Sequence, residues 1–428
     1  MKPRCAALQK ARPSESVFAR LQWVKRRDPI KLGLLLATIP LSCGAAYAQS
    51  SVTLYGVIDI GIAYQSINSS DLPQFTGSRF GINNGVQSGS RFGLRGSEDL
   101  GNGLRATFTL ENGFDAGNGT LNQSGRLFGR QVWAGLESNQ WGYIRAGRQY
   151  NFATDFFTPI DPFGAGFGQA NMGVAFGSMN TTRYSNMLKI QSPNWSGFTM
   201  GAGYSFAPQL SAFYVNNGQV YSGTGNSYNF DTADNTRAVT LGLNYTSGPL
   251  TIAASYDQVM PNPNTPGVSG GATMPVAREW ILGGSYNWQV AQLALAVGQN
   301  TGGIINGQNF TSGGNPAPID GNGGTWGGSS GGVLFGDGVS YTSYLVGLTV
   351  PYGQSASFFG SWSLAHPGSS TVGLTQGGAG NQNTYNLGYQ YNFTKRTNLY
   401  AAVSYATGPG LVSGVSSTFL VSGIRHQF

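Results

Sequence analysis

Apolar and polar side chains alternate along the chain from residue 51 onward. In residues 51–65 (SVTLYGVIDIGIAYQ), one face carries Leu54, Ile58, Ile60, Ile62 and Tyr64, and the other carries Thr53, Asp59, Gly61 and Gln65. A period of two residues with one polar side predicts a half-exposed β-strand. The stretch exceeds the roughly 5–6 residues of a common soluble strand. It covers the roughly 9–11 residues that a tilted strand needs to cross a bilayer, so we interpret it as one strand of a membrane barrel.

The same alternation recurs between connections that are short and long in turn. Clear examples are residues 239–246 and 385–392, where Leu, Val or Tyr opposes Thr, Gly, Asn or Gln. Short turns are predicted near residues 98–103, 138–140, 192–194, 246–249, 287–289, 351–353 and 392–396. Long connections are predicted near residues 67–87, 115–126, 149–182, 207–235, 261–275, 301–340, 366–381 and 407–416. These fifteen connections imply sixteen strands, and the even number places both termini on the short-turn side.

The apolar face of these strands has no second layer to cover it. A soluble β-protein would bury that face against a helix or another sheet, and no helical period is evident in the sequence. Aromatic residues near strand ends fit the girdles at a membrane surface; they are Tyr64, Trp141, Trp195, Trp280, Trp288, Tyr352, Tyr391 and Tyr405. The predicted fold is therefore all-β, a transmembrane 16-stranded antiparallel barrel, closed because an open edge in hydrocarbon costs several kcal/mol per backbone group. Such a barrel is too wide for side chains to fill and holds water.

One connection, residues 151–182, is unusually long and rich in Gly, Phe and Asn (NFATDFFTPIDPFGAGFGQANMGVAFGSMNTT). Compact domains rarely leave so long a structureless loop between neighbouring strands. We expect this third long loop to fold inward and narrow the pore.

The positive charge of the chain is concentrated at its N-terminus. The first 48 residues hold nine of the 24 Lys and Arg residues and two of the 17 acidic ones, so they account for the whole net charge of +7. A basic cluster, an apolar run over residues 32–41 and the triplet Ala46-Tyr47-Ala48 form the pattern of a cleaved signal peptide. The basic region is longer than usual, which an extended signal or a later start codon would each explain. The prediction is a signal peptide over 1–48 and a single barrel domain over 49–428, whose balanced charge argues against nucleic-acid binding.

The composition argues against catalysis and against a cofactor. With 66 Gly and 10% charged residues, the chain is unlike a soluble enzyme of its length. Cys5 and Cys43 both leave with the signal, so a mature thiol site is excluded. His366 and His426 lack a neighbouring Ser and acid, and no metal cluster is evident. We predict no enzyme, no cofactor and no metal site, although a calcium ion held by loop backbone oxygens stays open.

Several segments in order resemble one family, the trimeric general-diffusion porins of Gram-negative outer membranes in their β-proteobacterial form. The segments are SVTLYGVIDIG, SGSRFGLRGSEDLGNGLRATFTLENGF, FGRQVWAGL, WGYIRAGRQY, RYSNMLKIQSPNWSGF and the terminal GIRHQF. The resemblance implies a chain in the outer membrane, in contact with its lipid, with three barrels per assembly and a third loop that constricts each barrel. It also implies that the terminal aromatic, here Phe428, is recognised by the machinery that inserts barrels.

The resemblance places arginines on the barrel wall opposite acids on the third loop. The matching wall residues are Arg91, Arg95, Arg130 and Arg183, and the loop residues are Asp155 and Asp161. Alternation also turns Arg91, Arg95 and Arg183 inward, and it turns Arg105 and Glu111 inward as well. Alternation alone would group Arg130 with Val132, so its inward placement follows the resemblance. By the same parity Arg148 is predicted to face a neighbouring subunit, together with Ile144 and Ala146.

The predicted function is passive diffusion of small hydrophilic solutes and ions. Rings of charge set selectivity in pores, and four or five arginines against two aspartates predict a mild anion preference. One alternative is a substrate-specific channel, in which Phe156, Phe157 and Phe163 stack against sugars. The other is a non-conducting adhesin or scaffold that acts through the loops at 207–235 and 301–340.

Overall fold

The computed structural model describes residues 51–70, 76–216, 219–223, 236–262, 274–306, 332–368 and 379–428, with backbone only over 211–216 and 219–223. The predicted signal peptide, residues 1–48, lies outside the described residues, so it stays a prediction. No helix in the described ranges is long and apolar enough to cross a membrane.

Nineteen strands make up the sheet in the described part of the chain. They are β1 (Ser51–Ser69), β2 (Gly77–Asn84), β3 (Arg91–Gly101), β4 (Leu104–Gly113), β5 (Gln131–Ser138), β6 (Gly142–Tyr150), β7 (Arg183–Gln191), β8 (Phe198–Ser205), β9 (Ser211–Asn216), β10 (Gln219–Gly223), β11 (Arg237–Ser247), β12 (Leu250–Met260), β13 (Ala277–Asn287), β14 (Gln292–Asn306), β15 (Gly332–Tyr352), β16 (Ala356–Pro367), β17 (Gln382–Asn392), β18 (Thr397–Thr407) and β19 (Val415–Gln427). The seven short turns fall between strands where the sequence predicts them.

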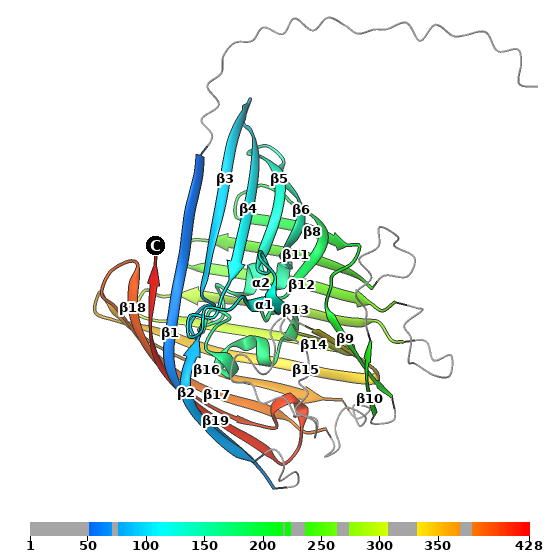
Figure 1. The fold of residues 1–428 in the computed structure, drawn as a ribbon, viewed down its shortest axis with the longest axis vertical. Coiled ribbons are helices and arrows are strands. Elements are labelled where there is room, and N and C mark those ends of the chain that lie inside the picture. The colour runs from blue at the N-terminus through cyan, green and yellow to red at the C-terminus, as the bar shows by residue number, and fades with distance from the viewer. Residues whose placement is uncertain are drawn as a thin grey trace, which may run out of the picture. The chain divides into compact units, whose positions relative to one another are not determined.

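The sheet closes on itself because its first and last strands pair. β1 and β19 run antiparallel, with Val57 opposite Gln427 and Ser69 opposite Val415. The remaining wall strands pair antiparallel with their neighbours around the ring (Figure 1). Closure leaves no unpaired edge in hydrocarbon, which is the physical condition for a strand protein to span a bilayer.

The number of wall strands is sixteen, as predicted. β2 and β3 count as one wall strand, because both pair with β1, one with its second half and one with its first. β9 and β10 stand outside the ring: β8 pairs directly with β11, while β9 runs parallel to residues 332–336 of β15. The predicted loop at 67–87 is therefore wrong in part, because β2 continues the hairpin with β1 over residues 77–84.

Strand two of the wall is interrupted between β2 and β3. Residues 85–90 leave the sheet, and Asp59 on β1 bonds to them instead: its backbone oxygen accepts from Gly85 N (2.8 Å) and its carboxylate from Ser88 N (2.6 Å). The backbone oxygen of Val86 in turn accepts a hydrogen bond from Phe167 N in the third long loop.

The wall has an apolar outer face and a polar inner face. On β17, for example, Leu387 is 57% exposed while its neighbour Asn386 is 9% exposed. The same contrast separates Leu241 from the buried Thr240 on β11. In a monomer without lipid, an exposed apolar belt and buried polar residues are the reverse of a soluble protein, and they match a barrel whose outside faces hydrocarbon.

We call residues 151–182 loop 3. It contains the short helix α2 (Phe152–Phe157) and the 3₁₀ turns η3 (Gly168–Ala170), η4 (Met172–Val174) and η5 (Gly177–Met179). Elsewhere the described loops form α1 (Asn122–Gly125) and η7 (Pro409–Leu411). Asn151 caps α2, since its side-chain oxygen accepts a hydrogen bond of 3.0 Å from Thr154 N.

Loop 3 bonds to the polar face of the wall across half of the barrel. Phe152 N donates to Thr240 Oγ1 on β11 (3.0 Å), and Ser178 N donates to Glu279 Oε2 on β13 (2.6 Å). Farther round, Gln169 Nε2 donates to the backbone oxygen of Ser404 on β18 (3.1 Å). Because these partners all belong to the face opposite the apolar belt, the contacts of loop 3 are on the inner side of the wall.

Two kinds of packing hold loop 3 in place. Under α2 the wall carries glycines: a Cβ on Gly242 would lie 2.6 Å from the side chains of Phe152 and Phe156. At the other side, the ring of Phe167 lies 5.5 Å from that of Phe359 and 5.3 Å from that of Tyr400. Small wall residues therefore hold the first helix of loop 3, and an aromatic cluster holds its middle.

Candidate functional site: a cavity between loop 3 and the arginines of the wall

A cavity of about 800 Å³ lies between loop 3 and the wall strands near the N-terminus. Its lining includes Arg91, Arg130 and Arg183 from the wall and Asp155 from the loop, with residues 82–89 at one edge. The strand-two interruption, Thr154 of α2 and Asp115 also belong to the lining. The cavity is therefore largely polar, and its wall side is positively charged.

Glu111 on β4 lies at the centre of the arginine cluster. Its Oε1 accepts a hydrogen bond of 2.7 Å from Arg130 Nε, and its Oε2 lies 3.6 Å from Arg91 Nε. The hydroxyl of Tyr55 also donates to Oε2 (3.0 Å). The predicted inward orientation of Glu111 therefore places one carboxylate among the guanidinium groups.

Tyr150, the last residue of β6, joins two of the arginines. Its hydroxyl accepts hydrogen bonds from Arg130 Nη2 (2.8 Å) and from Arg183 Nη2 (2.6 Å). In the described part of the chain no carboxylate lies within 4.0 Å of Arg183. Three guanidinium groups and one carboxylate leave this cluster with a net charge of +2.

The inward position of Arg130 has a simple structural reason. β5 begins at Gln131, so Arg130 precedes the strand and its side chain does not follow the alternation that turns Val132 outward. The side chain is 10% exposed and bonds to Glu111 and Tyr150. For Arg130 the family resemblance predicts the inner face, where the side chain lies, whereas the alternation of residues predicts the outer face.

Arg95 and Arg105 lie on the inner face but outside the cavity lining. The guanidinium of Arg95 lies 5.3 Å from the ring centre of Tyr55, and Arg105 Nη2 lies 3.8 Å from Glu137 Oε2. The cluster that the sequence predicted is accordingly smaller, since only three of the predicted arginines meet at the cavity.

The prediction that Arg148 faces a neighbouring subunit is wrong. Its guanidinium is buried and donates to the backbone oxygen of Gly129 (2.7 Å) and to Ser185 Oγ (2.9 Å). The register between β6 and β7 shifts between Gly147 and Gln149, and Gly147 has a φ of 138°. A β-bulge changes which side a following residue faces, so parity counted from Ile144 fails at Arg148.

Of the two acids of loop 3 that are predicted to lie opposite the wall arginines, only Asp155 lines the cavity with them. Asp155 on α2 forms an ion pair with Lys189 Nζ of β7. Asp161 is 5% exposed and accepts hydrogen bonds from the backbone N–H groups of Phe163 (3.1 Å) and Ala165 (2.9 Å). Asp161 does not line the cavity; it holds a turn of the loop together, so its predicted position opposite the arginines is wrong.

The phenylalanines of loop 3 are not available to a solute. Phe156 is 9% exposed, Phe157 0% and Phe163 2%. They pack against the wall and one another, which argues against the stacking track that a sugar-specific channel would use. No cluster of three or more His, Cys, Asp or Glu side chains that could hold a metal occurs among the described residues.

Phe428 follows β19 and completes the closure of the barrel. Its backbone N–H donates to the oxygen of Gly56 on β1 (3.1 Å), and Gly56 N donates back to the oxygen of Phe428 (3.0 Å). Its side chain is 45% exposed, so the terminal aromatic is presented at the outer face of the last strand.

Sequence reasoning missed two residues of the site. It assigned no role to Tyr150 or to Lys189, although Lys189 shares the inward parity of Gln191 on β7. The inward position of Lys189 on a strand next to the loop is a sequence feature that could have indicated a role in the site. Tyr150 lies at the end of its strand, and no feature of the sequence indicates its role.

A closed sixteen-stranded ring with an apolar outer belt and a charged internal cavity defines an outer-membrane channel. The family model for Gram-negative porins matches residues 34–410, and the chain belongs to this family. As a porin of the outer membrane it is a channel and not an enzyme, as the sequence predicted.

Relatives and solved structures agree with this assignment. The chain is 45% identical over 394 residues to an outer membrane porin protein of Bordetella pertussis, covering 90% of this chain and 96% of that one. It is 28% identical to outer membrane porin protein 32 of Delftia acidovorans, covering 93% and 100%. An anion-selective porin from Comamonas acidovorans superposes with a TM-score of 0.63 at 26% identity, covering 89% of this chain and 100% of that one. OmpF of Salmonella typhi in complex with daunomycin, at 15% identity, a TM-score of 0.59 and coverage of 88% and 97%, shares the fold.

Proposed function

We propose that this porin is a general-diffusion channel with a mild preference for anions, and that loop 3 makes its constriction. The observation that carries the proposal is the charge at the cavity. Arg91, Arg130 and Arg183 share the carboxylate of Glu111, Lys189 neutralises Asp155, and Asp115 is the remaining acid of the lining, so the sum is +1. This net positive charge lowers the electrostatic energy of a small anion at the cavity and raises that of a small cation.

The charge acts where the passage is narrow. At physiological ionic strength the Debye length is about 8 Å, so the arginines have little effect on ions in a wide, water-filled vestibule. An ion in the cavity, which is lined by Arg91, Arg130 and Arg183, lies close enough to these arginines to be affected by their charge. The likeness to a porin described as anion-selective supports the same sign of selectivity here.

The assembly and export of the protein form part of the proposal. Resemblance to the family supports a homotrimer, cleavage of residues 1–48 as a signal peptide, and recognition of Phe428 by the barrel-insertion machinery. The exposed ring of Phe428 at the end of the last strand is compatible with such recognition.

Planar-bilayer recording of the folded protein tests the channel and its selectivity together. We expect ohmic single-channel steps and a reversal potential in a KCl gradient that favours chloride. A reversal potential that favours potassium would contradict the anion preference. An absence of conductance would contradict the channel itself and favour an adhesin or scaffold, and saturating flux of one solute would favour a substrate-specific channel.

A further inference from the structure

We propose that Lys189 is a specificity-determining residue of the constriction. It neutralises Asp155 on the loop side of the cavity, so that the arginines on the wall side are left as the uncompensated charge. The inference deepens the proposed function and rests on it, since it concerns the same cavity.

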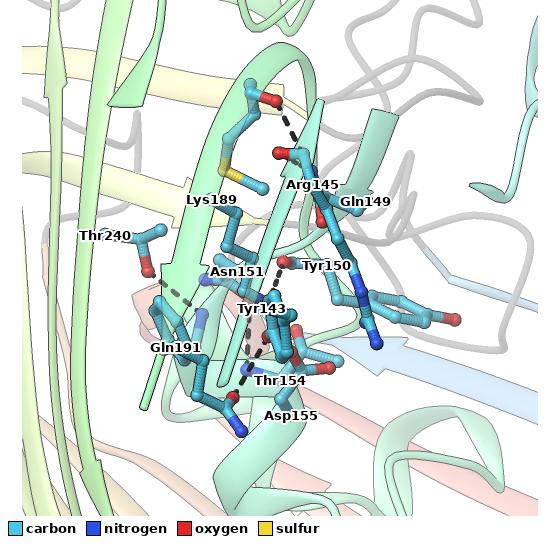
Figure 2. A network of polar contacts seen from close by, with 12 residues as sticks. Tyr143, Arg145, Gln149, Tyr150, Asn151, Thr154, Asp155, Lys189, Gln191 and Thr240 are labelled. Atoms are coloured by element: carbon cyan, nitrogen blue, oxygen red, sulfur yellow. Dashed lines mark hydrogen bonds and ion pairs between the residues drawn. The ribbon is translucent and has the colours of Figure 1, made fainter. Parts of the chain in front are cut away.

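Lys189 is held by three groups at the base of loop 3. Its Nζ donates a hydrogen bond of 2.8 Å to the backbone oxygen of Tyr150 and another to Asp155 Oδ2. It also lies 4.2 Å from the ring centre of Phe152. Figure 2 shows Lys189 from β7, the Tyr150 backbone at the end of β6 and Asp155 on α2 meeting at this point.

These contacts use the whole donor capacity of the ammonium group. A lysine has three N–H donors; two point at oxygens, and the remaining side faces the ring of Phe152, which attracts a cation. The side chain is 3% exposed. Lys189 is therefore fixed beneath the loop and cannot turn its charge toward the pore.

Of the Asp155–Lys189 pair, only Asp155 is in contact with the cavity. Asp155 lines the cavity and its side chain is 34% exposed, whereas Lys189 does not belong to the lining. A passing ion thus approaches a carboxylate whose charge is balanced by an ammonium in direct contact. Without that ammonium, a bare carboxylate would face the arginines across the cavity.

The net charge around the cavity depends on Lys189. The arginine cluster with Glu111 has a net charge of +2, Asp115 in the cavity lining lowers the sum to +1, and the Asp155–Lys189 pair adds nothing. Loss of Lys189 would lower the sum to zero and create a negative side opposite the positive one. Selectivity should then move toward cations even though no residue lining the cavity has changed.

The test is a double-mutant cycle of reversal potentials with Lys189→Met, Asp155→Asn and the double variant. A unit charge about 8 Å from the ion path in a water-like dielectric changes the population of a monovalent ion about twofold. Chloride and potassium respond in opposite senses, so we expect the permeability ratio to move about fourfold toward potassium in Lys189→Met. We expect a similar shift toward chloride in Asp155→Asn, and the parent value in the double variant.

The cycle separates charge from displacement of the loop. Lys189→Met and the double variant both lose the anchor, so any conductance change caused by movement of loop 3 is common to them. Equal reversal potentials in these two variants would overturn the inference. As a matched control, Lys395→Met removes a lysine from the short turn between β17 and β18 and should not shift the potential.

Failure of the inference can be told apart from failure of the proposed function. Arg183→Gln in the same bilayers reports on the arginine cluster, and a loss of chloride preference there upholds the proposed constriction whatever Lys189→Met does. If Lys189→Met yields no channels, Asp155→Asn decides alone: a shift toward chloride supports the inference, and no shift overturns it.

Discussion

The guanidinium of Arg183 lies 4.5 Å from the ring centre of Tyr150 and donates a hydrogen bond of 2.6 Å to its hydroxyl. The same hydroxyl accepts from Arg130 at 2.8 Å. Two like charges are thus fixed side by side by a neutral group. A second carboxylate could hold the same two arginines, but it would cancel half of the net charge of the arginine cluster.

Removal of this hydroxyl should destabilise the site without reversing its selectivity. In Tyr150→Phe both guanidinium groups lose a hydrogen bond that involves a charge, so we expect the free energy of unfolding to fall by about 1.5–3 kcal/mol. Urea unfolding in lipid vesicles measures the loss. Tyr143→Phe is the matched control, because its hydroxyl bonds to the uncharged Gln191 (3.0 Å) and should cost about 1 kcal/mol. Equal losses in the two variants would contradict the role of Tyr150.

Arg91→Ser should enlarge the cavity and weaken the preference for chloride. Arg91 lines the cavity, and its removal lowers the charge of the cluster from +2 to +1. We expect a higher single-channel conductance and a permeability ratio nearer to unity by about fourfold, on the Coulomb estimate for one charge. Arg105→Ser, outside the cavity and beside Glu137, should change neither quantity appreciably. Unchanged conductance and selectivity in Arg91→Ser would reject its position at the constriction.

Asp161→Ala should loosen loop 3 while ion selectivity stays the same. The carboxylate accepts hydrogen bonds from three backbone N–H groups, those of Phe163, Ala165 and Met172. Each buried donor left unpaired costs about 1–3 kcal/mol, so we expect noisier open-channel current and faster proteolysis of the loop. A shift of the reversal potential comparable with that of Arg91→Ser would instead mean that Asp161 faces the pore.

Gly242→Val should push α2 away from the wall and narrow the pore. Even a Cβ at this position would lie 2.6 Å from Phe152 and Phe156. Carbon atoms in contact prefer about 3.5–4.0 Å, so the helix must move by about 1 Å toward the lumen. We expect a lower single-channel conductance. Gly81→Val on β2, where an added Cβ meets nothing within 4 Å, is the control and should conduct like the parent.

The barrel could be predicted from the sequence because its physical causes are local and repeated. Alternation of apolar and polar residues marks each strand, and the spacing of turns gives the number of strands. The departures are places where a strand is irregular. Periodicity cannot detect the register shift at Gly147 that turns Arg148 inward, or the interruption of residues 85–90 between β2 and β3.

The arrangement of charges within the cavity could be predicted only in part. Resemblance and parity placed Arg91, Arg130, Arg183 and Glu111 on the inner face. Neither says which partner a residue finds there, so the ion pair of Asp155 with Lys189 could not be predicted. For Asp161 the deciding factor is the local path of loop 3, which brings three backbone N–H groups to one carboxylate.

Because strand two is interrupted, the residues that border the cavity between β2 and β3 are not part of the strand pairing that closes the barrel. β2 and β3 each keep their own register on β1, so the ring of strands is complete whatever the length of residues 85–90 between them. The same residues border the cavity and contact Phe167. Insertions or deletions there can therefore change the bore of the channel while the scaffold that carries it stays intact, and pores of different calibre can arise on one unchanged framework.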